Sequence, residues 1–162
     1  MLKTSFSFAG LEKLSSLKKL EVLDLSFNVD IDNDILPSLM TLTSLKILDL
    51  SFTSLNGNFP IKFAALENLK VLDLSNCNFN GVSILKKLKS LNPGYNRFNE
   101  SAATSLNTLS SLTNLDLSNN PLLGPFPAQE LAHLTNLEKL DLSFTQLNGT
   151  PDIQGKWRIG FS

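Results

Sequence analysis

The chain has very few side chains that could carry out covalent chemistry. Its one cysteine, Cys77, and its one histidine, His133, are the types that form a thiol nucleophile and its base. His133 lies two units away in a repeating pattern described below, so the two side chains are not expected to meet. Because an unpaired cysteine is commonly buried, Cys77 is interpreted as part of the core. The sequence predicts no enzyme, no metal site and no cofactor.

Two regularly spaced series of side chains are better candidates for binding. The first series is acidic apart from one amide and consists of Asp24, Asp49, Asp73, Asn92, Asp116 and Asp141. The second is largely aromatic and consists of Phe27, Phe52, Asn76, Tyr95, Asn119 and Phe144. A third series comprises Val22, Ile47, Val71, Ser90, Asn114 and Lys139. The members of each series can lie side by side only if the chain is built from repeated units.

The pattern Leu-x-Leu-x-x-Asn, in which Thr or Cys sometimes replaces Asn, supplies these units. It begins at Leu23, Leu48, Leu72, Leu91, Leu115 and Leu140, at intervals of 25, 24, 19, 24 and 25 residues. One unit cannot enclose its own leucines, so successive units must stack and share a core. The sequence therefore predicts a right-handed α/β solenoid of about six repeats, with a curved parallel sheet on its concave face.

Each predicted unit has a strand, a turn and a return segment. The strand carries inward leucines such as Leu48 and Leu50, and the return carries leucines at helical spacing. The turn residues are Asn28, Thr53, Cys77, Asn96, Asn120 and Thr145. We expect the asparagine amides to satisfy backbone groups of the adjacent coil. The three series above then form columns on the concave face.

One unit, LNPGYN, departs from the pattern because Pro93 replaces the second leucine and the preceding interval is about five residues short. Leu115 follows in phase, so this unit is interpreted as a degenerate repeat and not as a domain boundary. Proline cannot donate to a sheet ladder, which predicts a local defect in a continuous solenoid. The predicted organisation is a solenoid over residues 1–153, with an incomplete first coil at 1–20 and a degenerate repeat around 77–96, followed by a divergent tail at 154–162.

The stretch LKILDLSFTSLNGNFP, from Leu45 to Pro60, resembles the plant-type leucine-rich repeat L-x-x-L-x-L-x-x-N-x-L-x-G-x-I-P. Residues 124–127 and 149–151 match the G-x-x-P part less completely, and the resemblance covers roughly residues 11–152. The chain is thus similar to the extracellular domain of plant receptor-like proteins. It shows no signal peptide, cysteine-paired cap, membrane helix or kinase domain of that family, so we expect a fragment or a truncated form.

The resemblance implies a recognition module on the extracellular side of the plasma membrane, acting in defence or developmental signalling. Its partner would be a protein or peptide ligand on the concave face, with a co-receptor kinase as a further candidate. The candidate ligand-binding residues are Asp24, Phe27, Asp49, Phe52, Asp73, Tyr95, Asp116, Asp141 and Phe144. Two alternatives remain open, a secreted protein similar to polygalacturonase inhibitors and a truncated product without binding activity.

Charge and sequons add two expectations. The net charge is −1 with both signs interspersed, which gives no reason to expect nucleic acid or membrane contact by this segment. Asn99 and Asn148 begin N-x-Ser/Thr sequons, which would carry glycans if the parent protein is secreted.

The acidic and aromatic columns also have structural interpretations. The aspartates could be hydrogen-bonded to neighbouring serines and backbone, and the rings could simply cover the rim of the sheet. Like charges about 5 Å apart repel by roughly 1 kcal/mol in water, so an acidic column without internal partners would attract a basic peptide or a cation. The sequence leaves the binding and the structural interpretation of each column open.

Overall fold

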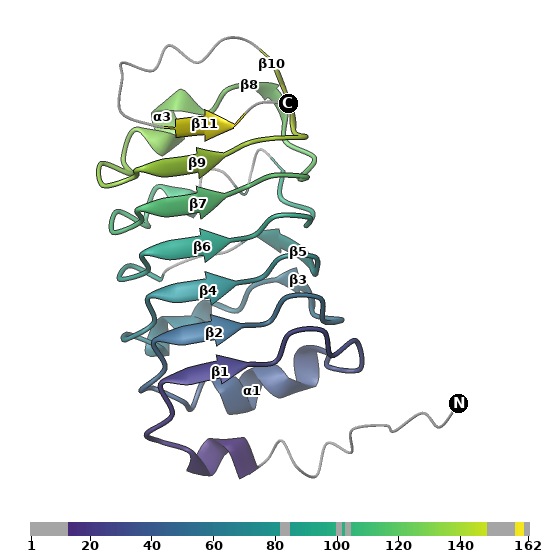
Figure 1. Cartoon of the computed structure of the whole chain (residues 1–162), viewed down its shortest axis with the longest axis vertical. Helices are drawn as coiled ribbons and strands as arrows, with labels where there is room; N and C mark the ends of the chain where they lie inside the picture. The colour runs from purple at the N-terminus through teal and green to yellow at the C-terminus, as the bar shows by residue number, and fades with distance from the viewer. Residues whose placement is uncertain (1–12, 82–84, 100–101, 103–104, 149–157, 161–162) are drawn as a thin grey trace.

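The computed structural model describes residues 13–81, 85–99, 102, 105–148 and 158–160. Its chain winds into stacked coils that contribute three-residue strands to one seven-stranded parallel sheet (Figure 1). In order across the sheet, the strands are β1 (Val22–Asp24), β2 (Ile47–Asp49), β4 (Val71–Asp73), β6 (Ser90–Asn92), β7 (Asn114–Asp116), β9 (Lys139–Asp141) and β11 (Arg158–Gly160). The predicted solenoid with a parallel sheet is confirmed. The last strand, β11, lies outside the repeat and pairs with β9.

Two smaller parallel sheets lie beyond the turns of the coils. In the first, β3 (Asn56–Asn58) pairs with β5 (Asn78–Gly81). In the second, β8 (Leu123–Pro125) pairs with β10 (Gln146–Asn148). One strand in each sheet contains a glycine with positive φ, 79° at Gly57 and 85° at Gly124, and glycine adopts this region without a Cβ clash. The recurring glycines in the sequence therefore mark these strands.

Short helical turns form the return segments opposite the main sheet. They are η2 (Asn33–Ile35), α1 (Leu36–Leu39), η3 (Ile61–Ala65) and α3 (Ala128–Leu131). Leu39, Leu42 and Leu45 are fully buried, so the leucines at helical spacing point into the core as predicted. The Asp32 carboxylate accepts a hydrogen bond from the amide of Asp34 and caps η2.

One continuous core runs through the stack. The inward leucines of the strands belong to it, and Leu50, Leu74 and Leu117 are at most 1% exposed. Phe59 adds an aromatic cluster between coils, with its ring centroid 4.3 Å from that of Phe63 and 5.4 Å from that of Phe79. This shared interior is why the coils form a single body.

Pro93 changes the sheet by a single hydrogen bond. At the equivalent position in other coils, the amides of Leu50, Leu74 and Leu117 donate to the next strand at 2.8–2.9 Å. Proline has no N–H, so the pairing of β6 with β7 extends over two residue pairs, whereas β6 pairs with β4 over three. The sheet continues through this local defect.

A buried ladder of turn residues joins consecutive coils. The Asn96 side-chain Nδ2 donates to the carbonyl of Leu74 in the preceding coil at 2.7 Å, and its Oδ1 accepts from the amide of Phe79 at 2.9 Å. Asn120 repeats this arrangement, with its Nδ2 2.9 Å from the Pro93 carbonyl and its Oδ1 2.9 Å from the Phe98 amide. The predicted role of the recurring asparagine is therefore confirmed in these two coils.

Cys77 occupies the same ladder. Its Sγ donates to the Leu50 carbonyl at 3.2 Å and lies 3.4 Å from the Thr53 hydroxyl. The side chain is buried, and His133 is exposed in another coil. Burial raises the pKa of the Cys77 thiol, so this cysteine is a core residue, as the sequence indicated.

The raised pKa of Cys77 predicts a specific pH dependence of stability. Above about pH 9, the ordinary pKa of a cysteine thiol, the unfolded chain releases its proton before the folded chain does. The free energy of unfolding should then fall with rising pH faster in the wild type than in Cys77→Thr, whose new side chain already serves at Thr53 and Thr145. Urea titrations of both proteins between about pH 8 and 10.5 measure this difference. Parallel curves would contradict the prediction.

Candidate ligand-binding surface

The acidic column lies in line across the exposed surface of the seven-stranded sheet, here called the sheet face. The parallel register pairs Asp24 with Asp49, Asp49 with Asp73, and Asp73 with Asn92. It also pairs Asp116 with Asp141. Adjacent parallel strands are about 4.8 Å apart, so the structure brings these predicted site residues together as expected.

Each aspartate in the column also has a structural task. One carboxylate oxygen accepts a hydrogen bond from the backbone amide two residues further on, at 2.8–2.9 Å in all five cases. Asn92 does the same at 3.1 Å with the amide of Gly94. At Asp24 the hydroxyl and the amide of Ser26 together lower the pKa of the carboxyl group. The structural interpretation of the column therefore accounts for one oxygen of each side chain.

The second oxygen of most of these carboxylates stays available. In Asp73 it accepts from the Asn92 side-chain amide at 2.8 Å. Within the described part of the chain, the second oxygens of Asp24, Asp49, Asp116 and Asp141 have no hydrogen-bond or salt-bridge partner. The sheet face thus presents carboxylate oxygens that no described residue engages and that an incoming molecule could contact.

The aromatic column has an unexpected backbone conformation. All six of its residues have φ between 52° and 58°, in the left-handed region. The cause is tertiary, because several of these residues donate their amide to the next coil, as Phe27 does to Ser51 and Tyr95 to Ser118 at 2.9 Å. Asn76 and Asn119 are of a type that tolerates this region, whereas a bulky aromatic residue there is an outlier.

Few contacts within the folded chain stabilise the exposed rings and offset the cost of their left-handed backbone conformation. Phe27, Tyr95 and Phe144 are 71%, 59% and 67% exposed. Phe27 stacks on Phe52 with ring centroids 4.5 Å apart, and such a pair contributes about 0.5–1.5 kcal/mol. Within the described residues, no such ring contact involves Tyr95 or Phe144. The structure therefore does not support the idea that these two rings merely cover the rim.

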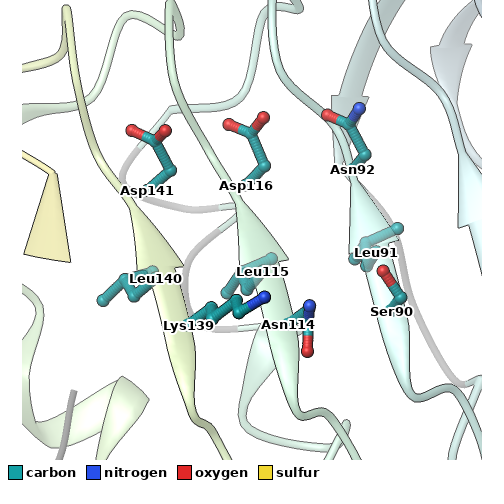
Figure 2. A pocket seen from close by; sticks show the side chains of 9 residues that line it. All are labelled: Ser90, Leu91, Asn92, Asn114, Leu115, Asp116, Lys139, Leu140 and Asp141. Carbon is teal, nitrogen blue, oxygen red and sulfur yellow. The ribbon is translucent and has the colours of Figure 1, made fainter. Parts of the chain in front are cut away.

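A hollow of about 440 Å³ lies on the sheet face over β6, β7 and β9. Figure 2 shows two rows of polar side chains across it, with leucines between them. One row, at the ends of the strands, is Asn92, Asp116 and Asp141. The other, at their beginnings, is Ser90, Asn114 and Lys139. The second row belongs to the third series of the sequence, to which sequence reasoning assigned no function.

Two sequence models, both described as Leucine Rich Repeat, match residues 44–66, 68–92 and 111–130, and residues 16–40 and 133–150. Together they cover more than half of the chain. The chain belongs to the leucine-rich-repeat proteins.

Its relatives include plant receptor-like proteins. This leucine-rich-repeat chain is 41% identical over 137 residues to receptor-like protein 13 of Arabidopsis thaliana, a match that covers 78% of this chain and 13% of that protein. It is 46% identical over 76 residues to putative receptor-like protein 8 of the same plant, covering 44% of this chain and 8% of that protein. The chain thus spans a small part of the length of these relatives.

Solved structures support the fold. The crystal structure of internalin C2 from Listeria monocytogenes superposes with a TM-score of 0.70 at 24% identity, covering 92% of this chain and 74% of that chain. At this identity the likeness concerns the leucine-rich-repeat fold alone.

The remaining predicted sites of this leucine-rich-repeat protein lie away from the sheet face. Asn99 and Asn148 are exposed, while Ser101 and Thr150 of their sequons fall outside the described residues. Among the described residues, no cluster of His, Cys, Asp and Glu is suited to a metal ion. No helix in that part of the chain has the length and apolar character needed to cross a bilayer.

Proposed function

We propose that this chain is a protein or peptide recognition module of a plant cell-surface receptor-like protein. It would lie on the extracellular side of the plasma membrane and act in defence or developmental signalling, with a co-receptor kinase as a further partner. The relationship to receptor-like protein 13 supports this class of protein. The ligand would bind the sheet face through Asp24, Phe27, Asp49, Phe52, Asp73, Tyr95, Asp116, Asp141 and Phe144, and Asn99 and Asn148 would carry glycans.

One observation carries the proposal, namely that exposed aromatic side chains occupy left-handed turn positions. A bulky residue there costs about 1–2 kcal/mol compared with the right-handed region, and asparagine at Asn76 and Asn119 performs the same turn. Exposed rings such as Tyr95 and Phe144 therefore do not serve stability. Aromatic side chains are enriched in protein interfaces, so contact with a partner explains why rings occupy these positions.

The test replaces the rings with the residue that the turn itself tolerates. Tyr95→Asn and Phe144→Asn should each raise the free energy of unfolding by about 1 kcal/mol, because the strain is relieved. The same changes should weaken ligand capture about tenfold or more, because interface aromatics contribute strongly to binding. Stability is measured by urea titration, and capture by quantitative mass spectrometry of plant membrane and extracellular extracts passed over the immobilised chain.

Two control variants separate strain from binding. Asn119→Phe introduces a ring at a left-handed turn and should lower the free energy of unfolding by about 1 kcal/mol. Ile61→Asn removes an exposed apolar side chain in η3, away from the sheet face, and should leave capture unchanged. If Tyr95→Asn and Phe144→Asn capture the same proteins as the wild type, the proposed use of the aromatic column is wrong.

A further inference from the structure

We propose that the hollow over β6, β7 and β9 binds an extended peptide in which a basic and an acidic residue are separated by one residue. This inference rests on the proposed recognition function and names the chemistry of one subsite. The basic side chain would lie between Asp116 and Asp141, and the acidic side chain would lie against Lys139 and Asn114. The candidate residues identified from the sequence did not include Ser90, Asn114 or Lys139.

The spacing of the two polar rows sets the register of the ligand. Lys139 and Asp141 are two residues apart on β9 and line the same hollow, about 6.6 Å apart along the strand. An extended peptide has the same rise per residue, so its own side chains at positions i and i+2 match this spacing. Adjacent charged residues would point to opposite sides of the peptide and could not reach both rows.

The polar groups of the hollow are free to meet such a peptide. The Lys139 ammonium forms no ion pair, and the Asn114 side-chain amide no hydrogen bond, with any described residue. Figure 2 shows the Lys139 side chain reaching toward Asn114 and away from Asp141. Across the leucines, the second oxygens of Asp116 and Asp141 are also without partners in the described chain. Unpaired donors and acceptors thus face one hollow from opposite sides.

The charges favour this dipolar ligand over a single charge. Two carboxylates on adjacent strands, which are about 4.8 Å apart, repel each other. A guanidinium between them offsets this repulsion and donates N–H hydrogen bonds to both second oxygens. Within the described chain, Lys139 then has no anionic partner unless the same ligand brings one. Asn92, on β6, does not extend the acidic row. Its side-chain nitrogen donates to Asp73 and its side-chain oxygen accepts from the Gly94 amide.

Among the strands whose side chains the structure describes, the polar residues of the third series lie on β6, β7 and β9. In the third series, Val22, Ile47 and Val71 on β1, β2 and β4 give way to Ser90, Asn114 and Lys139 on β6, β7 and β9. Val22 and Ile47 are 56% and 40% exposed. They lie in the same two coils as Phe27 and Phe52, whose rings stack on each other. Three strands that carry apolar residues of the third series therefore lie beside three strands that carry polar ones, and the polar group determines which charges the ligand must have.

The test uses defined peptides and the full chain. Nine-residue Gly/Ser peptides containing Arg-Ala-Glu or Arg-Glu-Ala, which have identical composition, are titrated into the ¹⁵N-labelled protein. Arg-Ala-Glu should bind about two- to fivefold more tightly than Arg-Glu-Ala, because both peptides can place arginine between the aspartates and only the first can also reach Lys139, which adds one exposed ion pair. Its amide shifts should centre on β6, β7 and β9, and the preference should diminish with added salt. Equal affinities, or shifts elsewhere on the chain, would overturn the proposal.

A charge change should redirect the preference. Lys139→Glu makes the hollow uniformly acidic, so it should favour an Arg-Ala-Arg peptide over Arg-Ala-Glu about fivefold. The double variant Asp116→Asn/Asp141→Asn keeps the turn hydrogen bonds, as Asn92 shows, but removes both carboxylates. It should therefore bind Arg-Ala-Glu and Arg-Glu-Ala equally. If these variants capture the same partners as the wild type while Tyr95→Asn and Phe144→Asn do not, the subsite is wrong and the recognition function stands. If the reverse holds, the subsite stands and the aromatic column is wrong.

Discussion

Replacing Asn120 with alanine is expected to lower the free energy of unfolding by about 3 kcal/mol. The Asn120 side chain is 2% exposed, donates to the carbonyls of Pro93, Leu117 and Ser118, and accepts from the amide of Phe98. Alanine leaves the Phe98 amide and the Leu117 carbonyl without this side-chain partner, whereas the carbonyls of Pro93 and Ser118 keep hydrogen bonds from Asn96 and Tyr95. Each unsatisfied buried group costs about 1–3 kcal/mol. Urea denaturation followed by circular dichroism measures the loss.

Thr145→Ala is the matched control for Asn120→Ala. Thr145 holds the same position in the last coil of the repeat, is only half-buried, and donates one hydrogen bond, to the carbonyl of Leu142. Its loss should cost about 1 kcal/mol or less. If the two variants lose equal stability, the buried ladder does not connect the coils energetically.

Replacing Leu74 with alanine is expected to lower the free energy of unfolding by about 3–4 kcal/mol. Leu74 is fully buried in the core shared by consecutive coils, so its truncation removes apolar contacts and leaves a cavity between them. Because each coil depends on its neighbours, the loss should appear in the unfolding of the whole chain. Calorimetry and urea titration measure it.

Leu25→Ala should be milder, at about 1–2 kcal/mol. Leu25 holds the equivalent position in the first described coil, where it is only half-buried, and among the described strands β1 pairs with β2 alone. A loss at Leu25 equal to that at Leu74 would mean that stability does not follow the sharing of leucines between coils.

Much of the acidic column followed from the sequence, whereas its chemistry did not. The repeat interval placed Asp24, Asp49 and Asp73 in one row, and the register confirms it. Which oxygens remain free depends on hydrogen bonds that need three-dimensional neighbours, such as that from the Asn92 amide to Asp73. The pattern of residue types gives the row of aspartates but not which of their oxygens lack a hydrogen-bond partner.

The sequence by itself determined the solenoid, because a repeated leucine spacing allows a shared core only when successive coils stack. It also determined the roles of Asn96, Asn120 and Cys77, since equivalent positions in stacked coils have equivalent surroundings. The tertiary structure alone decided the left-handed turns, which are held by backbone hydrogen bonds between coils, such as that from the Phe52 amide to the Ser75 carbonyl at 3.0 Å. It alone added β11 and opposed Lys139 to Asp116 across one hollow, because residues far apart in the chain meet only after the coils have stacked.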